Sequence, residues 1–332
     1  MKFLPFTKIL FLASLLCCTA CQNNQQGAII TVNQNGDMTV FGQPAPDLET
    51  LKMMLTDSLV NMTGIPDNIS ISFEGEVGMG ARQEVETIAA EAIEAAKLAK
   101  LAPRVELQSF RKQQGKDCDQ PDSLRMDCAV IDLLYPAVIK GEKALQDSVS
   151  AWTNSYLTGI LAGGSDTGDK ASTLSEAAKV FFKTHKDFKG SAMGGGFEAS
   201  TGSEVVYNNG QYLTLAINGY TYQGGAHGNH TEALNTFDAK TGKILTWDDL
   251  VTDKAAVQAL AEKKVREARA DVFQEGFQFD DIFPFVLPAS YGLTKEGLFL
   301  YYVPYEIMPY AMGETEVLIP FEELGPLSKI RL

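Results

Sequence analysis

Histidine is scarce in this chain, with three among 332 residues. No Ser-His-Asp, Cys-His or His-Glu-x-x-His arrangement is laid out along the sequence as a recognisable motif. The glycine clusters are not followed by Gly-Lys-Ser/Thr and do not form Gly-x-Gly-x-x-Gly, so they do not match a nucleotide-binding loop. We therefore expect a protein that is not an enzyme and that uses no cofactor.

Positive charge is also in short supply, because 28 Lys and Arg residues stand against 42 Asp and Glu and leave a net charge of −14. Nucleic acid is not an expected ligand, since its phosphates require a basic surface. The acidity instead favours cationic partners, which the field of the protein would attract. The alternative is that the charge only keeps an exported protein soluble.

Long hydrophobic runs are absent except at residues 9–16, which follow Lys2 and Lys8. This run is too short to span a bilayer and is typical of a signal peptide, here residues 1–20. The next residues, Cys18-Thr19-Ala20-Cys21, resemble the lipobox of bacterial lipoproteins, although the pattern prefers Leu where Cys18 stands. The resemblance implies a lipid on Cys21 and a membrane-anchored protein of the cell envelope, facing the periplasm or the cell surface.

The alternative for this segment is a plain secretory signal that is cut nearby. Loss of residues 1–20 would remove two lysines and no acid, so the net charge would become about −16. Residues 21–27 then form a short polar tether, and any contact with the membrane would be through the lipid alone.

Cysteine is rare after Cys21, where only Cys118 and Cys128 occur, on either side of a polar loop. An exported protein folds in an oxidising compartment, so a disulfide between them is expected. Metal binding by two thiols ten residues apart, without a second pair, is disfavoured.

Residues 28–103 have the pattern of a first small domain. An Asn35-Gly36 turn predicts a hairpin, Asp47 is a candidate N-cap for the helix after it, and a second helix is expected over residues 81–101. The stretch ITVNQNGDMTVFGQPAPDLETLKMML, followed by a strand and an alanine-rich helix, resembles the periplasmic domain of ExbD/TolR proteins. The resemblance implies the fold of that domain, without its transmembrane helix.

Residues 104–210 are expected to form a second domain, with helices over residues 143–161 and 174–187 and a hairpin turn at Asn209-Gly210. The stretch VIDLLYPAVIKGEKALQDSVSAWTNSYL resembles the domain that precedes the deacetylase domain in PdaC-type proteins. The deacetylase domain itself has no counterpart in this sequence.

Residues 211–332 are expected to form a third domain, in which one long helix covers residues 254–274. Two of its stretches, residues 220–250 with the turn glycines Gly224, Gly225 and Gly228 and residues 297–320 with PYEIMPYAMG, resemble in sequence and order the C-terminal domain of RsiV-type proteins. The best-known kind of that family is a lysozyme-binding anti-sigma factor. The resemblance implies a domain that binds a lysozyme-like protein.

The candidate binding residues lie in these two stretches. Tyrosine gives a large contact area at low entropic cost and is enriched at interfaces, although alternation places about half of the tyrosines of residues 301–310 in the core. The partner-binding candidates are Tyr222, His227, His230, Tyr305, Glu306 and Tyr310.

A further alternative is a metal-dependent hydrolase in which His227 and His230 bind the metal, with Glu232 or Asp238 as a further ligand. The competing interpretation, which we favour, is that His227 hydrogen-bonds within the loop, that His230 faces solvent and that no metal binds.

Together these patterns predict a multidomain α+β exported lipoprotein made of small αβ sandwich domains with antiparallel or mixed sheets. The leading functional hypothesis is a non-catalytic envelope protein that binds a basic lysozyme-like protein, or a cell-wall glycan, through its PdaC-type and RsiV-type domains. The alternative is an accessory component of an envelope assembly that docks through the ExbD/TolR-like domain.

Overall fold

The computed structural model describes the chain except for residues 1–28, 122–125, 164–170, 189–194, 281 and 331–332. The predicted lipid-bearing Cys21 therefore lies outside the described residues. The described residues form two compact units, divided between Glu94 and Ala95. Both combine helices with antiparallel or mixed sheets, which confirms the predicted α+β class. Within the described residues, no helix has the length and apolar character needed to cross a membrane.

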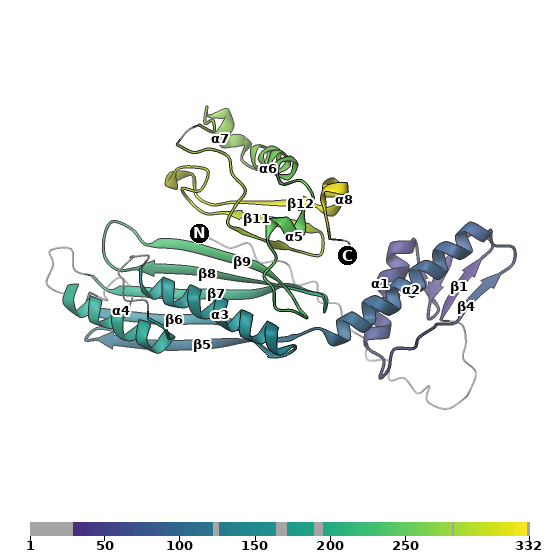
Figure 1. Ribbon diagram of the computed structural model, residues 1–332, viewed down its shortest axis with the longest axis horizontal. Helices are drawn as coiled ribbons and strands as arrows, with labels where there is room; N and C mark the ends of the chain where they lie inside the picture. Colours follow the sequence, from purple (N-terminus) through teal and green to yellow (C-terminus); the bar gives the residue numbers. More distant parts are fainter. Residues whose placement is uncertain (1–28, 122–125, 164–170, 189–194, 281, 331–332) are drawn as a thin grey trace. The chain divides into compact units, whose positions relative to one another are not determined.

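The first unit is a four-stranded mixed sheet with helices packed on it (Figure 1). Its strand order is β3-β2-β1-β4, with β1 and β4 parallel. The Asn33 side chain accepts hydrogen bonds from the backbone N–H of Asn35 and Asp37, and this fixes the hairpin turn predicted at Asn35-Gly36. Asp47 caps α1 as predicted, by accepting from the Thr50 N–H. The elements are β1 (Ile30–Asn33), β2 (Met38–Val40), β3 (Gln43–Ala45), α1 (Leu48–Val60), β4 (Ile71–Glu74) and α2 (Met79–Leu101).

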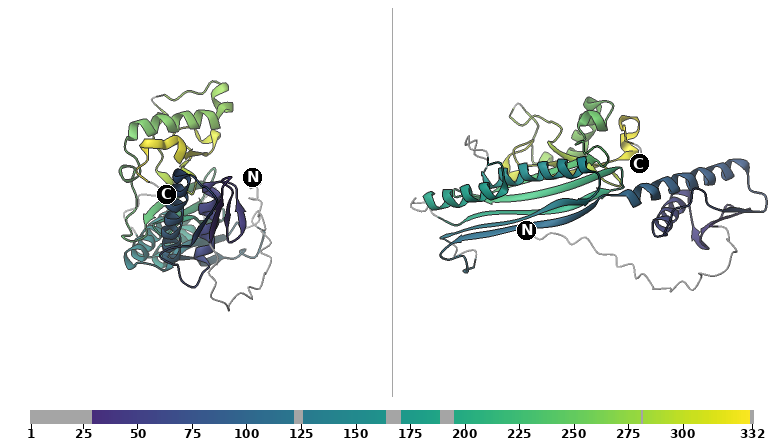
Figure 2. Two further views of the ribbon diagram at one scale, coloured as in Figure 1. Left: turned by 90° about the vertical axis from the view of Figure 1, so that its right-hand side faces the viewer. Right: turned by 60° about the horizontal axis from the view of Figure 1, so that its bottom comes forward.

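A five-stranded sheet with the order β5-β6-β7-β8-β9 forms the base of the second unit. Two helices, α3 and α4, cover one of its faces (Figures 1 and 2). The predicted Asn209-Gly210 turn joins β7 to β8 inside this sheet, so the sheet continues across the domain boundary expected between residues 210 and 211. The elements are β5 (Arg104–Gly115), β6 (Cys128–Lys140), α3 (Lys143–Leu161), α4 (Leu174–Phe188), β7 (Phe197–Asn208), β8 (Tyr212–Tyr222) and β9 (Asn229–Asp238).

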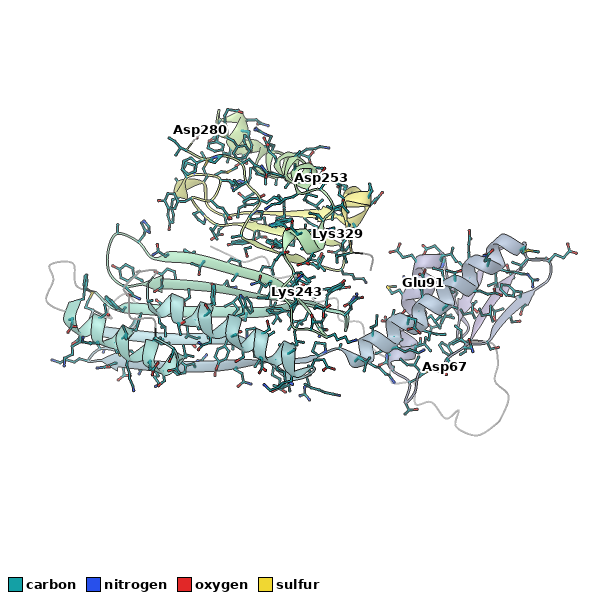
Figure 3. All side chains as sticks on the ribbon, viewed as in Figure 1. Asp67, Glu91, Lys243, Asp253, Asp280 and Lys329 are labelled. Atoms are coloured by element: carbon teal, nitrogen blue, oxygen red, sulfur yellow. A yellow bond between two sulfur atoms is a disulfide. The ribbon has the colours of Figure 1, made fainter. Side chains whose placement is uncertain are left out.

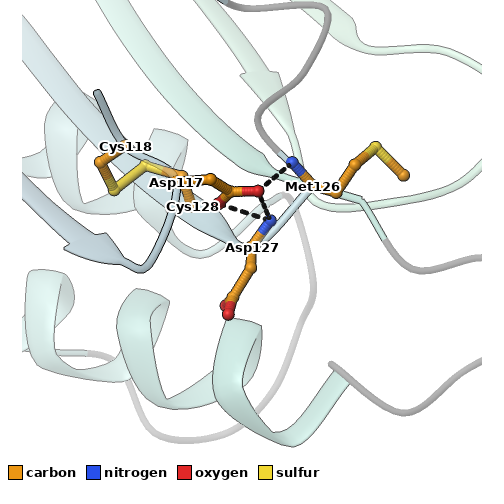
Figure 4. Close-up of a disulfide and its surroundings, with 5 residues drawn as sticks. All are labelled: Asp117, Cys118, Met126, Asp127 and Cys128. Carbon is orange, nitrogen blue, oxygen red and sulfur yellow. Dashed lines mark hydrogen bonds between the residues drawn. A yellow bond between two sulfur atoms is a disulfide. The ribbon is translucent and has the colours of Figure 1, made fainter. Parts of the chain in front are cut away.

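A disulfide joins Cys118 to Cys128 where β5 ends and β6 begins, as predicted (Figure 4). The Asp117 carboxylate beside it accepts hydrogen bonds from the backbone N–H groups of Met126 and Asp127. The covalent bond and the carboxylate together close the loop between the two strands.

Replacing both cysteines by serine is expected to lower the free energy of unfolding by roughly 2–3 kcal/mol, because a loop of about ten residues then gains freedom in the unfolded chain. Urea unfolding of the oxidised wild type and of the double variant measures the difference. A double variant that unfolds at the wild-type urea concentration would contradict this role.

A three-stranded antiparallel sheet with the order β10-β11-β12 forms the C-terminal part of the second unit. One of its faces packs with the helices around a core that includes Leu298, Leu300 and Tyr302. The sheet is held to β9 by hydrogen bonds from the Leu234 N–H to Ser290 Oγ and from the Leu293 N–H to Thr236 Oγ1. The elements are α5 (Trp247–Leu250), α6 (Lys254–Ala268), α7 (Ala270–Gln274), β10 (Ser290–Leu293), β11 (Gly297–Tyr302), η2 (Tyr310–Met312), β12 (Thr315–Pro320), α8 (Phe321–Leu324) and η3 (Gly325–Leu327).

The helix predicted over residues 254–274 is wrong in one respect, because it breaks at Arg269 into α6 and α7. Arg269 has φ −115° and ψ 35°, outside the helical region. Its guanidinium donates hydrogen bonds to the carbonyl of Met312 and to Thr315 Oγ1. These contacts with a distant segment favour the break over the helical pattern of the local sequence.

Two lysines hold α5 against its neighbours (Figure 3). Lys243 forms an ion pair with Asp249, and Lys329 Nζ donates a hydrogen bond of 2.6 Å to the carbonyl of Asp248. A capping box between Thr246 and Asp249 starts the helix, as expected for acids near a helix N-terminus.

Candidate functional site

The face of the five-stranded sheet that lies opposite α3 carries tyrosines and carboxylates at its β7–β9 end. Side chains alternate along a strand, and Leu213, Leu215 and Phe237 of β8 and β9 pack with α3, so their neighbours point to the other face. The register places Tyr220 beside His230 and Tyr222 beside Glu198. The carboxylates of Glu204 and Glu232 follow along the same face.

The C-terminal sheet and the loop after β11 border this face. Tyr301 pairs with Glu316 across β11 and β12, on the face of that sheet opposite its core. In the loop, the Tyr310 ring stacks on His227 with centroids 4.7 Å apart and lies 5.6 Å from the Tyr305 ring. The loop after β11 therefore meets the loop between β8 and β9 through aromatic rings.

We call these residues the tyrosine–glutamate surface. It consists of Glu198, Glu204, Tyr220, Tyr222, His227, His230, Glu232, Tyr301, Tyr305, Tyr310, Glu314 and Glu316.

The loop between β8 and β9 is shaped by its glycines. The Tyr222 hydroxyl donates a hydrogen bond to the carbonyl of Gly225, and His227 Nδ1 lies 3.0 Å from the carbonyl oxygen of Gly228. A Cβ on Gly228 would lie 2.2 Å from the Tyr220 ring, so only glycine lets that ring lie where it does. The loop contact expected for His227 is thus present, and His230 is exposed as expected.

Gly224 and Gly225 provide a matched test of the loop. Both have positive φ, 86° and 112°, but a Cβ would meet the Phe188 ring at 2.6 Å only at Gly224. We expect Gly225→Ala to cost about 1 kcal/mol from backbone strain and Gly224→Ala about 2 kcal/mol, because the latter also displaces Phe188. Thermal unfolding of the two variants would contradict this account if Gly225→Ala were the less stable.

The carboxylates of the tyrosine–glutamate surface repel one another. Burial, together with the charges of Glu204, Glu316 and Glu314, raises the pKa of Glu232 to about 7. Burial and the charge of Glu314 also raise the pKa of Glu316. Among the described residues, none of these four carboxylates forms an ion pair with a Lys or Arg side chain. The surface is therefore suited to a positively charged group from outside.

His227 and His230 contact different tyrosine rings. His227 stacks on Tyr310, whereas the His230 ring lies 5.0 Å from the Tyr220 ring. Across the residues that the structure describes, no three His, Cys, Asp or Glu side chains are grouped as metal ligands would be.

Five of the six predicted partner-binding residues meet on this surface, and the sixth does not. The two carboxylate oxygens of Glu306 accept hydrogen bonds from the backbone N–H groups of Ala289 and Val303, at 2.7 and 3.1 Å. Burial raises the pKa of Glu306, and these hydrogen bonds oppose the rise. The residue thus holds the loop that presents Tyr305.

Sequence reasoning missed Tyr220 and the glutamates that flank it. Alternation alone would have placed Tyr220 and Tyr222 on one face, but the partners across β7 and β9 depend on a register that the sequence did not provide. The surface also joins residues more than 70 positions apart, such as Glu232 and Tyr310.

Comparison with known proteins places two domains on this chain. Residues 124–230 match the family described as deacetylase PdaC. Residues 248–322 match a family described as protein of unknown function, DUF3298. The first match confirms the predicted PdaC-type resemblance. The RsiV-type and ExbD/TolR-type resemblances stay predictions.

Two solved structures share the fold. A DUF3298 family member from Bacteroides fragilis NCTC 9343 is 20% identical, with a TM-score of 0.52 over 69% of this chain and 95% of its own. A DUF3298 family protein from Pseudomonas aeruginosa PAO1 is 19% identical, with a TM-score of 0.51 over 69% of this chain and 96% of its own. No curated protein matched the chain. At these identities the likeness concerns the fold alone.

Proposed function

We propose that this chain is a non-catalytic binding protein of the cell envelope and that its tyrosine–glutamate surface binds a basic protein. The observation that carries the proposal is the meeting of one exposed and several half-buried tyrosine rings with carboxylates that have no cationic partner among the described residues. Tyrosine rings supply contact area, and the carboxylates select a partner with Lys or Arg side chains.

The position of Tyr305 supports a binding role. Its side chain is 61% exposed and its φ is 74°, a conformation that non-glycine residues seldom adopt. The Tyr305 N–H donates to the Met308 carbonyl at 2.9 Å. The carboxylate of the neighbouring Glu306 accepts hydrogen bonds from the Ala289 and Val303 N–H groups. The loop thus holds an exposed tyrosine whose backbone conformation is strained, and such strain is frequent at binding sites.

The envelope location rests on three observations. The Cys118–Cys128 disulfide suits an oxidising compartment. The first 21 residues have the pattern of a lipoprotein signal, and the chain resembles PdaC over residues 124–230. In this proposal the protein is exported and anchored by a lipid on Cys21, so that its domains face the periplasm or the cell surface.

A lysozyme-like enzyme is the partner that we propose first. The RsiV-type resemblance of residues 220–250 and 297–320 motivates this choice, and the acidity of the chain suits the strongly basic character of such enzymes. Electrostatic attraction would speed the encounter, and the tyrosines would hold the complex.

Titration calorimetry of lysozyme into the full chain tests the proposal. At low salt we expect a 1:1 complex with a dissociation constant below about a micromolar, and slower association as the salt concentration rises. Cytochrome c, another small basic protein, is the control for charge alone. Binding no tighter than about a millimolar would exclude lysozyme as the partner, and association that ignores salt would exclude the carboxylates as the attracting groups.

A further inference from the structure

A groove of about 420 Å³ lies between α3 and β6, on the helix-covered face of the five-stranded sheet. Sites for small ligands commonly fall between roughly 300 and 1,000 Å³. Its floor is Tyr135–Val138 of β6, and its rim includes Leu174 at the start of α4. The groove is thus large enough for a small molecule and is separated from the tyrosine–glutamate surface by the sheet.

One side of α3 gives the groove a polar wall. The side chains of Gln146, Ser150, Thr153 and Asn154 recur at helical spacing along it. The apolar side of the same helix, with Leu145 and Val149, packs on β6, β8 and β9 instead. Of these four side chains, Ser150 is exposed, Gln146 and Asn154 are half-buried and Thr153 is buried, so the strip runs from solvent to the sheet.

Thr153 is the residue that points to a ligand. Its side chain is 4% exposed, and its hydroxyl oxygen has no hydrogen-bond partner in the described part of the chain. A buried hydroxyl without a partner costs stability. One turn further along the same helix, the Thr158 hydroxyl donates to the carbonyls of Asn154 and Ser155, so a satisfied threonine is possible on α3.

Below the groove, β6 pairs with β5, whereas its pairing with β7 has already ended. The ladder between β6 and β7 ends at the pair Leu133 and Thr201. The hydroxyls of Thr201 and Ser203 then donate to the Leu134 carbonyl in place of backbone groups. In the described residues, Tyr135 and Pro136 therefore have no strand partner in β7, and they are available as the floor.

The lining is electrically neutral. Asp147 is its one charged residue among those described, and it pairs with Lys143 on the preceding turn of α3. Among the described residues of the lining, there is no Lys or Arg to hold an anion. A ligand that fits must combine hydroxyl or amide groups, for the α3 wall, with an apolar face, for Tyr135 and Pro136.

We propose that this groove binds a neutral, hydroxyl-bearing ligand of one or two sugar rings, with the Thr153 hydroxyl as a hydrogen-bond partner. A pyranose offers hydroxyl groups at its edge and C–H groups on its faces, so it matches both walls. This inference does not depend on the proposed protein partner, which would bind the opposite face of the sheet.

The test measures binding of N,N′-diacetylchitobiose and cellobiose to the full chain by calorimetry and by chemical-shift changes of the α3 and β6 amides. Ser150 is exposed, so Ser150→Trp should fold and should fill the groove. We expect Ser150→Trp to abolish binding and Thr153→Val to weaken it by about fivefold to tenfold, the loss of one hydrogen bond. Thr158→Val is the matched control and should bind as the wild type does.

A second readout separates a ligand-binding threonine from a structural one. Because the Thr153 hydroxyl is unpartnered, Thr153→Val should unfold at the same temperature as the wild type or higher while binding less tightly. A variant that lost stability and binding together would overturn the assignment of Thr153. Failure of both disaccharides to bind at about 10 mM, or binding that survives Ser150→Trp, would overturn the site itself. Tyr305→Ala should leave disaccharide binding unchanged, so this result is independent of the lysozyme experiment.

Discussion

Tyr310→Ala is expected to weaken the binding of the basic partner by about thirtyfold or more, the effect of removing one central aromatic anchor. The Tyr310 ring lies between the rings of Tyr305 and His227, so its loss also frees those two. Tyr305→Ala should have an effect of similar size, because its ring is the most exposed tyrosine of the surface. The double variant should lose at least about a hundredfold, less than the product of the single effects, since the two rings support each other.

Two controls distinguish a binding role from a folding role. Tyr310→Phe keeps the ring and should retain most of the affinity. Ile282→Ala removes a 77% exposed apolar side chain of the same unit that is not part of the tyrosine–glutamate surface, and it should bind as the wild type does. Calorimetry gives the affinities, and thermal unfolding shows that each variant is folded. Equal affinity for Tyr310→Ala and Ile282→Ala would contradict the proposed surface.

Local signals in the sequence were sufficient for much of the fold. The Asn35-Gly36 and Asn209-Gly210 turns, the Asp47 cap and the helix over residues 143–161 all occur where they were expected. Each of these features depends on neighbouring residues, since turns need particular backbone angles and caps need a side-chain oxygen. The Cys118–Cys128 bond was predictable because these two cysteines flank one polar loop in a chain expected to be exported to an oxidising compartment.

Features that depend on distant contacts were missed. The break at Arg269 is held by hydrogen bonds to Met312 and Thr315, more than 40 residues away. The parallel pairing of β6 with β7 joins strands that are separated in sequence by two helices. Periodicity in one segment carries no information about such partners.

In the candidate surface too, some residues could be predicted from the local sequence and others only from the tertiary structure. Tyr305 and Tyr310 were identified from their residue type, whereas Glu204, Glu232 and Glu316 reach the surface only through strand register. Glu306 was expected beside the tyrosines, but two backbone N–H groups bind its carboxylate. Residue type therefore identified Tyr222, Tyr305 and Tyr310, and tertiary structure added Tyr220, Tyr301 and the acids that accompany them.

Glu232→Gln is expected to raise the free energy of unfolding by about 3 kcal/mol at pH 7–8 and by less than about 0.5 kcal/mol at pH 4.5. The pKa of Glu232 is raised from 4.5 to about 7 by burial and by Glu204, Glu316 and Glu314. Below pH 4.5 the carboxyl is protonated in both folded and unfolded protein, so it costs nothing. As the pH rises toward 7, the unfolded chain ionises first and the folded state is penalised until the carboxyl ionises there too.

Urea unfolding at several pH values measures this difference. Glu275→Gln, at an exposed position that ends α7, is the control and should change stability little at any pH. Equal stabilisation by Glu232→Gln at pH 4.5 and pH 8 would show that charge is not the cause. The absence of stabilisation at pH 8 would show that the carboxyl is well solvated.

The same carboxyl should make partner binding depend on pH. A cationic side chain placed beside Glu232 favours its ionised form, so complex formation releases a proton when the free protein is studied below pH 7. Affinity should therefore rise between pH 6 and pH 8 in the wild type and change less in Glu232→Gln. Calorimetry in two buffers of different ionisation enthalpy detects the released proton directly. A complex that forms without proton release at pH 6 would show that the partner's positive charge does not lie beside Glu232. The binding surface would then consist of the tyrosine rings and the other glutamates of the tyrosine–glutamate surface.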